Sequence, residues 1–517
     1  MASSTAKLLE LLCIILFLHI SSCSSSSSSS NETTFNPHLS SIRSFCKSTP
    51  YPDICFDSLK LRVSINITPN ILSYLLQSLN VAISEAGKLT DLFYKAEQYS
   101  KIVEKQKVPV QDCKELHQIT LSSLQRSVSR VQVQNAKKLN DARAYLSAAL
   151  TNKDTCMEGL ASASGPMKST LVNSLTSTYK YVSNSLSVIT KQGANKGRTN
   201  RREPCTWLHP CFPRWLSRRD CRILESSGNE YDPGEVLTVA ADGSGNFTTI
   251  SDAIIFSPNN SYDRTIIYVK EGIYEENVEI PSYKTNLVLF GDGSDITFIT
   301  GKRSYYDGWT PFRSATVAVS GEGFLARDIT IKNTAGPEKH QAVTLRINAD
   351  TLYVHSVRQF YGECDIFRTI DYICGNAAVV FQACTIVSKM PMPGQITVIT
   401  EQSRDTLDQN TEISMQNCSI VASDELHSNS SIVKSYLGRP WMIYSTTVTN
   451  WSGDLGLDTL YYREYKNYGP GAGTDNRVNW TRHHVMDYYD ASNFSVQEFI
   501  AGDEWLQSTL FPYDEGT

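Results

Sequence analysis

The sequence has 517 residues, which is too long for a single small binding module and leaves room for more than one folded unit at roughly 150 residues per domain. Hydrophobic residues make up 41% of the chain and charged residues 20%, which excludes a chain that is disordered throughout and favours a soluble, globular protein. The formal net charge of −5 provides no overall positive field, so nucleic acid is not expected as a partner.

The N-terminus has the anatomy of a signal peptide. The apolar stretch Leu8–Ile20 follows a short basic start and leads into small residues. We therefore expect residues 1–23 to direct secretion, while Glu10 inside the stretch keeps a signal anchor as the alternative. Residues 24–37 form a Ser-rich linker, and the thirteen cysteines of the chain agree with an extracellular protein.

Residues 38–190 have the periodicity of helices. Apolar residues recur at steps of three and four, which predicts amphipathic helices packed in an up-and-down bundle. The two clearest stripes are Leu72, Leu76, Leu79, Ile83 and Ala86, and Leu171, Leu175, Tyr179, Val182, Leu186 and Ile189. Four cysteines of this region allow three disulfide pairings, among which spacing alone does not choose. These cysteines are Cys46, Cys55, Cys113 and Cys156.

The composition changes in residues 191–231. Nine Lys and Arg residues face only two acidic residues between Lys191 and Arg222, and Gly and Pro interrupt the helical periodicity. This predicts a domain boundary. A solvated linker is one interpretation, but we favour a site for a processing protease, at Arg218-Arg219 or at Arg222–Glu225.

Residues 232–517 consist of short β-branched runs separated by Gly, Asn, Asp and Ser. The clearest runs are Thr265–Val269, Leu287–Phe290, Ala315–Val319, Phe324–Ile331, Ala377–Phe381 and Gln395–Ile399. No helical crossover of adequate length separates them, and their spacing favours a parallel β-helix over a sandwich. Such a solenoid offers a long open groove suited to a polymer.

Local strings in the helical region add a resemblance. The strings are Cys46–Cys55 (CKSTPYPDIC), Asp112-Cys113 and Ala148–Cys156 (AALTNKDTC). Over nearly its whole length this region resembles the invertase/pectin methylesterase inhibitor family. The resemblance implies a four-helix bundle with disulfides Cys46–Cys55 and Cys113–Cys156, and a role in holding a pectin methylesterase inactive.

Five further strings follow one another in the β region. They are Gly272–Glu276 (GIYEE), His340–Arg346 (HQAVTLR), Asp350–Ser356 (DTLYVHS), Asp371–Ala377 (DYICGNA) and Leu437–Trp441 (LGRPW). From about Val236 to Phe511 the chain resembles pectin methylesterases, in which these strings occur in the same order. The resemblance implies a right-handed parallel β-helix that needs no metal or other cofactor. It also implies a secreted cell-wall enzyme that acts on methyl-esterified homogalacturonan, the backbone of pectin, and that is inhibited by its own inhibitor-like domain.

The resemblance assigns a role to each candidate residue. Asp371 is the expected nucleophile, and Asp350 the acid that protonates the leaving methoxide and later activates water, so the pKa values of the two carboxyls must differ. Arg439 is expected to hold Asp371 ionised and oriented, and Gln341 to donate its amide to the tetrahedral oxyanion. The candidates for binding sugar are Trp441, Tyr353, Arg439 and Gln341.

Each assignment has a structural alternative. The two aspartates could be turn or cap residues, and Arg439 could lie on the surface. Gln341 begins an alternating run to Leu345 and so could face solvent, while Trp441 could belong to the core. His340 and His355 lack a Gly-x-Ser-x-Gly string, which argues against a serine hydrolase. Without metal-ligand spacing, buried thiols or a disulfide are expected for Cys364, Cys374, Cys384 and Cys418.

The sequence also departs from the family pattern. Ala349 stands where a second glutamine is expected before the acid, and Arg346–Asp350 lacks about one strand and turn. A similar shortening falls between Trp441 and Trp451, and Arg368 and Cys374 replace an expected glycine and an aromatic residue. We therefore expect slow or absent catalysis. A divergent protein and an incomplete gene model would give the same pattern.

Three classes of function remain in order of preference. The first is a carboxylesterase that demethylates homogalacturonan. The second is a binding protein, in which the inhibitor-like bundle engages a separate esterase and the β-helix is inactive. The third is a β-helical polysaccharide hydrolase or lyase, which would cleave the polymer chain.

Overall fold

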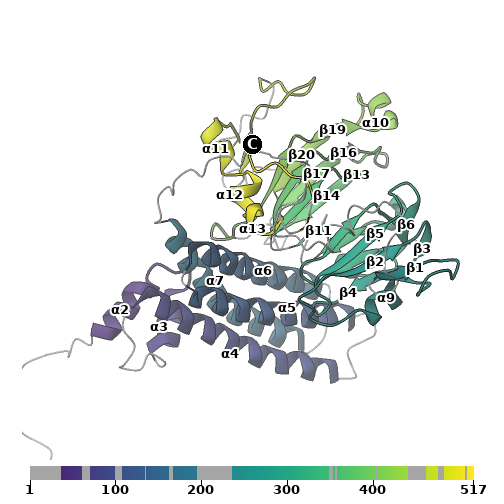
Figure 1. The fold of residues 1–517 in the computed structure, drawn as a ribbon. Coiled ribbons are helices and arrows are strands. Elements are labelled where there is room, and N and C mark those ends of the chain that lie inside the picture. The colour runs from purple at the N-terminus through teal and green to yellow at the C-terminus, as the bar shows by residue number, and fades with distance from the viewer. Residues whose placement is uncertain are drawn as a thin grey trace, which may run out of the picture.

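The computed structural model describes most of the chain from residue 37 onward (Figure 1). The described residues are 37–60, 70–98, 107–133, 135–161, 163, 167–194, 236–347, 353–355, 358–402, 404, 406–440, 461–475, 483–506, 509 and 511–516. The predicted signal peptide, nearly all of the Ser-rich linker and both predicted processing sites lie outside them. In the described ranges, no helix combines the length and the apolar character that crossing a membrane requires.

The N-terminal part is helical, as predicted. Its helices are α2 (Pro37–Cys46), α3 (Pro52–Lys60), α4 (Ile71–Gln98), α5 (Lys107–Gln132), α6 (Ala136–Ala161) and α7 (Met167–Ala194). The four long helices, α4 to α7, form the bundle, and the short helices α2 and α3 form a hairpin at one end (Figure 1). A disulfide joins Cys46 to Cys55 within the hairpin, and a second joins Cys113 on α5 to Cys156 on α6.

The apolar stripes fill the centre of the bundle. Leu79 and Ala86 on α4 and Leu186 on α7 are fully buried, which is the arrangement that a 3.6-residue period produces when four helices share one core. His117 on α5 is also buried, and its Nε2 lies 2.8 Å from the carbonyl oxygen of Ala86. Burial lowers the pKa of His117 to about 4, so the imidazole is neutral near pH 7.

The C-terminal part is a β-helix, and every strand pairing among its described residues is parallel. Its longest sheet has the order β4 (Val278–Ile280), β7 (Val317–Val319), β10 (Leu345–Ile347), β11 (Tyr353–Val354), β14 (Ile370–Gly375), β17 (Thr397–Gln402) and β20 (Ser435–Pro440). We call it the long sheet. The prediction of a helical bundle followed by a parallel β-helix is therefore confirmed.

The other two faces of the β-helix are each divided into two sheets. One face carries β1 (Val236–Val239), β2 (Thr265–Val269), β5 (Leu287–Gly291) and β8 (Leu325–Arg327), and then β12 (Arg358–Gly362), β15 (Ala378–Gln382) and β18 (Glu412–Gln416). The second face carries β3 (Gly272–Glu275), β6 (Thr297–Gly301) and β9 (Thr330–Asn333), and then β13 (Asp365–Arg368), β16 (Thr385–Ser388) and β19 (Ser419–Ala422). Only the long sheet therefore continues through the described part of the solenoid.

The interruption falls where the sequence is short. Arg358 on β12 pairs with Ala378 on β15, twenty residues later, whereas Arg346 on β10 pairs with Tyr353 on β11, only seven residues later. Parallel neighbours ordinarily need a connection of about a dozen residues or more. The described solenoid thus lacks most of one coil between β10 and β12, beside the segment at which the sequence departs from the family pattern.

Each half of the solenoid has its own core. The first half buries alternate residues of its strands, such as Ile267, Leu289 and Val317, and the second half buries Ile373 and Phe381. The short helix α9 (Ile250–Phe256) packs against β1, β2 and β4, and α10 (Asp424–Ser428) contacts β19. Three further helices follow the paired strands β21 (Tyr462–Glu464) and β22 (His483–Val485), namely α11 (Tyr488–Ser492), α12 (Val496–Ile500) and α13 (Gly502–Trp505). Residues of α12 share a hydrophobic cluster with Ala378 and Val380 of β15.

Candidate active site

Asp371 occupies an irregular position on the long sheet. It lies on β14 with a φ of +49°, and the register between β14 and β17 shifts between Ile370 and Ile373. On its C-terminal side, Ile373 is fully buried and the Tyr372 hydroxyl lies 3.0 Å from Ser388 Oγ. A β-bulge of this kind re-aims one side chain while its neighbours stay in the core. The half-buried Asp371 is thus set apart from the regular inward and outward alternation of the strand.

A row of in-register positions crosses the long sheet beside Asp371. Arg346 pairs with Tyr353, Tyr353 with Cys374, Cys374 with Glu401, and Glu401 with Arg439. Neighbouring strands in a sheet lie about 4.8 Å apart, and in-register positions share a face. We call these five positions the cross-sheet row. It brings two predicted site residues, Tyr353 and Arg439, onto strands on either side of the strand that carries Asp371.

Several charged groups act on Cys374. Burial raises the pKa of the Cys374 thiol, and the nearby carboxylates of Glu401 and Asp371 raise it further, against the opposing effect of Arg368. The carboxylate of Glu158, on helix α6 of the bundle, acts in the same direction. The thiol therefore stays protonated and is a poor nucleophile. The carboxylates around it, rather than the sulfur, are the groups suited to chemistry.

Arg368 connects this region to the predicted oxyanion donor. Its Nη2 donates a hydrogen bond to the carbonyl oxygen of Ala342, the residue after Gln341. Burial lowers the pKa of Arg368, three residues before Asp371. The segment that carries Gln341 therefore lies against the corner that leads into β14. The side chain of Gln341 is exposed, which agrees with the solvent-facing alternative.

The alternating run that begins at Gln341 is not a strand over most of its length, because β10 begins only at Leu345. In this segment, side chains rather than a neighbouring strand form hydrogen bonds with the backbone. The amide of Asn333 donates to the carbonyl oxygen of Val343 at 3.0 Å, and the amide of Val343 donates to Ser314 Oγ at 3.0 Å. Such side-chain bonds offer the backbone an alternative to the sheet. His340, with a φ of +59°, adds a sharp change of direction.

The remaining predicted site residues are only partly described. Asp350 and Trp441 lie outside the described residues. Tyr353 and Arg439 are placed by their backbone on β11 and β20. His355, two residues after Tyr353, is fully buried, and burial together with Arg346 lowers its pKa to about 3. It is therefore neutral near pH 7.

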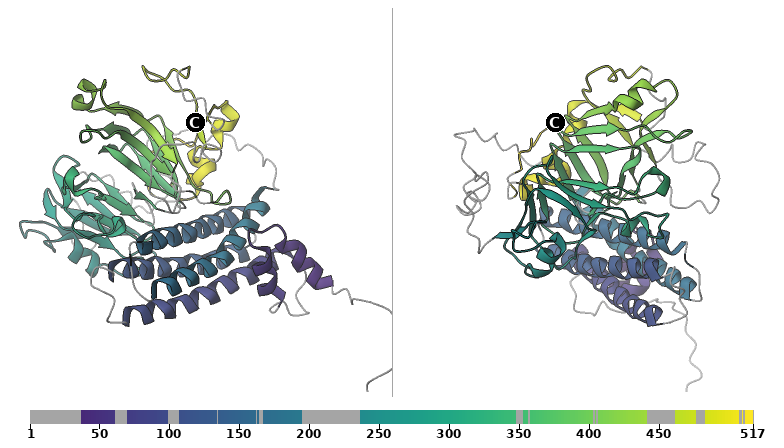
Figure 2. Two further views of the ribbon diagram at one scale, coloured as in Figure 1. Left: turned by 180° about the vertical axis from the view of Figure 1, so that it is seen from behind. Right: turned by 90° about the vertical axis from the view of Figure 1, so that its right-hand side faces the viewer.

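The bundle lies along the β domain, with α5 and α6 nearest to it (Figures 1 and 2). Thr155 Oγ1 on α6 lies 2.7 Å from His355 Nε2, and Phe312 of the β domain is buried within the bundle's own hydrophobic cluster. Further contacts include those of Asp112 and Glu115 with Arg313, Asp141 with Arg358, Arg143 with the carbonyl oxygen of Asp408, and Ser147 with the amide of Asn410. Helices α5 and α6 therefore lie against the β domain beside the cross-sheet row, where Glu115 approaches Arg346.

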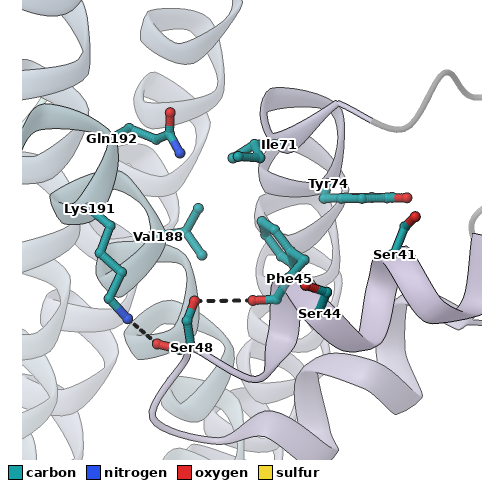
Figure 3. A pocket seen from close by; sticks show the side chains of 9 residues that line it. All are labelled: Ser41, Ser44, Phe45, Ser48, Ile71, Tyr74, Val188, Lys191 and Gln192. Atoms are coloured by element: carbon teal, nitrogen blue, oxygen red, sulfur yellow. Dashed lines mark hydrogen bonds between the residues drawn. The ribbon is translucent and has the colours of Figure 1, made fainter. Parts of the chain in front are cut away.

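A pocket of about 460 Å³ lies elsewhere, between α2, α4 and α7 (Figure 3). It is lined by Ser41, Ser44, Phe45, Ser48, Ile71, Tyr74, Val188, Lys191 and Gln192. Lys191 Nζ donates to the carbonyl oxygen of Ser48, and the lining contains neither a carboxylate nor a histidine. This pocket is therefore unsuited to the ester chemistry expected of the β domain.

Sequence reasoning missed three residues that the fold places at or beside the row. Glu401 and Arg346 lie in the row itself, and Phe312 anchors the bundle above it. A signal was present for Glu401, since a glutamate in the otherwise uncharged run Thr397–Gln402 is costly to bury and calls for a partner. No local signal reveals that these residues meet, because their proximity depends on which strands become neighbours.

Comparison with known proteins assigns a family to each of the two domains. The model of the family described as "Pectinesterase" matches residues 236–503, and that of "Plant invertase/pectin methylesterase inhibitor" matches residues 40–188. The chain is 59% identical over 555 positions to "Probable pectinesterase/pectinesterase inhibitor 12" of Arabidopsis thaliana, with 100% of each chain covered. It is 38% identical to "Pectinesterase 1" of Citrus sinensis, over 94% of this chain and 90% of that one.

A solved structure gives the same answer for the β domain. "Pectin methylesterase from Carrot" matches with a TM-score of 0.53 and 42% identity, and covers 56% of this chain and 100% of the carrot chain. The alignment with the Arabidopsis relative runs over 555 positions, although this chain has 517 residues. That relative therefore has residues for which this chain has no counterpart.

Proposed function

Because the chain belongs to the pectinesterase family of carboxylic ester hydrolases and carries an inhibitor domain of the plant invertase/pectin methylesterase type, we propose that it demethylates homogalacturonan in the cell wall. Pectin and water are converted into pectate and methanol. The observation that carries the proposal is the position of Asp371, held at a bulge beside the cross-sheet row, where its carboxylate, like that of Glu401, raises the pKa of the Cys374 thiol.

The chemistry needs two carboxyl groups and no metal. The Asp371 carboxylate attacks the carbonyl carbon of the methyl ester, and the tetrahedral oxyanion takes a hydrogen bond from Gln341. Asp350 protonates the departing methoxide, which leaves as methanol, and an anhydride forms between Asp371 and the uronate. Asp350 then removes a proton from water, which opens the anhydride and regenerates Asp371. Arg439 keeps Asp371 ionised and oriented, and Trp441 and Tyr353 present flat rings to the sugars.

The inhibitor domain acts on the esterase of its own chain. Helices α5 and α6 lie over the long sheet, and Glu158 of α6 is close enough to Cys374 to affect its titration. While the bundle is packed there, it competes with the polymer for this face. The basic linker supplies the site at which a protease cuts, near Arg219 or Arg222, so that secreted wall-bound protein begins shortly after Leu224. N-terminal sequencing of protein extracted from the wall checks this, and an exclusively full-length form would contradict it.

The coil that is missing between β10 and β12 determines the rate of ester hydrolysis that we expect. Without the second glutamine before Asp350, the oxyanion lacks one donor, and the loss of one such donor costs about 10²–10³ in rate. We therefore propose an esterase much slower than complete relatives. The alternative is an inactive homologue that binds a separate esterase through its bundle, and the residues of the Arabidopsis relative that have no counterpart here support it.

One assay separates these functions. Highly methyl-esterified pectin is incubated with the intact chain and with a chain cut at a protease site engineered into the linker, and both methanol and viscosity are followed. Methanol release that increases after cutting, at constant viscosity, supports the esterase. A fall in viscosity without methanol indicates cleavage of the polymer. If neither signal appears but the intact chain slows a second esterase, the binding protein is correct.

A further inference from the structure

Two carboxylates of the bundle hold two arginines of the β domain. Asp112 Oδ1 lies 2.6 Å from Arg313 Nε, and Glu115 Oε2 lies 2.5 Å from Arg313 Nη2. Glu115 also approaches Arg346, with 3.8 Å between Oε1 and Nη2. The hydroxyl of Thr310 adds a donor to Asp112 at 2.6 Å. The carboxylates belong to one turn of helix α5, and all of their partners here belong to the β domain.

Arg346 is the less satisfied of the two arginines. Its residue is 2% exposed, and within the described structure its Nε and Nη1 have no hydrogen-bond partner. The guanidinium lies 3.7 Å from the centre of the Phe312 ring, which provides a flat apolar support but accepts no N–H bond. Burial lowers the pKa of Arg346, as expected for a cation removed from water. A guanidinium has five donors, so most of the capacity of Arg346 is unused.

The two arginines lie near the sheet that carries the proposed nucleophile. Arg346 begins the cross-sheet row, and Cys374 lies two strands further along it, about 10 Å away at two strand spacings. Arg313 precedes β7, the other neighbour of β10. The acidic Glu279 balances Arg313 only weakly, because its Oε2 is 3.9 Å from Nη1 and its side chain is half exposed. If α5 leaves this face, a pair of cations is open beside the groove.

We propose that Arg313 and Arg346 form a subsite for a galacturonate carboxylate of partly de-esterified pectin, and that Asp112 and Glu115 occupy this subsite in the intact chain as carboxylate mimics. The inference rests on the proposed function, which makes a polyuronate the ligand. A planar guanidinium binds a carboxylate in two parallel hydrogen bonds, whereas a neutral methyl ester offers no such partner. The subsite therefore favours action next to units that have already been demethylated.

The mimicry explains why α5 carries acids at two positions one turn apart. A bundle that only excluded substrate would need an apolar surface. Removing carboxylates from water costs free energy, and the contacts of Asp112 and Glu115 with the two arginines offset that cost. Competition between α5 and product for the same arginines also links release of the bundle to the presence of de-esterified polymer. Both consequences depend on the same four side chains.

The test measures binding of fully de-esterified hexagalacturonate to the full-length chain by titration calorimetry. Asp112→Asn with Glu115→Gln removes both mimic charges and leaves both arginines in place. We expect the affinity to rise about tenfold or more, the factor that one charge-assisted contact supplies. Adding Arg313→Gln and Arg346→Gln should return the affinity to the wild-type value. The gain should diminish with added salt and be absent for methyl-esterified hexagalacturonate.

A matched control distinguishes exposure of the two arginines from a general weakening of the contact between the bundle and the β domain. Asp141→Asn removes the ion pair with Arg358 at another contact between the bundle and the β domain, but touches neither arginine of the subsite. It should leave the affinity at the wild-type value. Should the double variant fail to fold, Glu115→Gln alone, at a partly exposed position, should give a gain of about threefold.

Three results would overturn the subsite. They are an unchanged affinity in a folded Glu115→Gln or double variant, a gain that persists without the arginines, and an equal gain in Asp141→Asn. Because hexagalacturonate has no ester to hydrolyse, the outcome is independent of catalysis. Binding as expected without methanol release would remove the proposed esterase activity and leave a polyuronate site. Methanol release without the binding gain would remove the subsite alone.

Discussion

The two halves of the β-helix differ from the bundle in how they are held together. The bundle has one continuous core and a disulfide that joins α5 to α6. The β-helix has two separate cores, and within its described residues only the long sheet passes from one half to the other. The cross-sheet row crosses that junction, with Arg346 on one side and Cys374 on the other. The proposed site thus depends on the least supported part of the fold.

The bundle contacts both halves. Asp112 and Glu115 hold Arg313 in the first half, while Asp141 holds Arg358 and Thr155 contacts His355 in the second. The same two helices, α5 and α6, therefore lie against the site and also connect the two halves of the β-helix. Because the bundle has a continuous core and the β-helix a divided one, we expect the two domains to respond differently to mutation and to pH.

The largest effect is expected from repairing the junction. Inserting a segment of family length, with a glutamine directly before Asp350, should raise methanol release by about 10³, because it restores both the oxyanion donor and the stacking of neighbouring coils. Initial rates on esterified pectin measure this. Ala349→Gln without the insertion is the control. Recovery by the single substitution alone would show that the coil is dispensable, and no recovery by either would contradict this view of the defect.

Core substitutions should reveal two β units rather than one. Phe381 is fully buried and stacks on Tyr361 with 4.8 Å between ring centres, so Phe381→Ala should cost about 3–5 kcal/mol. Leu289→Ala, in the first half, should cost about 2–5 kcal/mol. Calorimetry of the cut chain should show that each variant lowers a different transition. If both variants lowered a single shared transition, the halves would be cooperative and the comparison would fail.

Acid should weaken the bundle through His117. Its pKa falls from 6.5 in the unfolded chain to about 4 in the folded one, so the unfolded state binds the proton first as pH falls. The contribution of the neutral imidazole is complete above pH 6.5 and is lost between pH 6.5 and 4, with an effect of about 3 kcal/mol. Urea unfolding at several pH values, monitored by the helical signal, should show that the free energy of unfolding falls as the pH falls over this range. His117→Gln should flatten this dependence, and an equal slope in the variant would contradict the assignment.

The smallest effect concerns the tie between the bundle and the second half. Arg358→Gln removes the β-domain partner of Asp141, 2.5 Å away, and should weaken association of the two pieces of the cut chain about tenfold, as expected for one hydrogen bond to a charged group. Analytical ultracentrifugation measures the dissociation constant. Arg303→Gln, which loses an ion pair with Glu279 inside the β domain, is the control. Equal weakening by both variants would show that the effect is not local.

Much of the fold could be predicted from the sequence because it depends on local periodicity. The stripe from Leu171 to Ile189 faces the bundle core, and the run Thr265–Val269 is strand β2. The site was harder to predict. The bulge at Asp371 depends on the register between β14 and β17, and the meeting of Arg346 with Glu115 depends on how two domains dock. Gln341 was misplaced in a strand because the alternating pattern cannot show that Asn333 and Ser314 compete for its backbone neighbours.

The central claim is that Asp371 attacks the ester, and methanol release by the cut chain with and without Asp371→Asn tests it most directly. The assay uses enough protein to detect a rate reduced by about 10³ relative to complete relatives. The account predicts that the cut wild-type chain releases methanol faster than the intact chain, and that cut Asp371→Asn stays at the background, because an amide is a poor nucleophile. Methanol release by Asp371→Asn at the wild-type rate would contradict it.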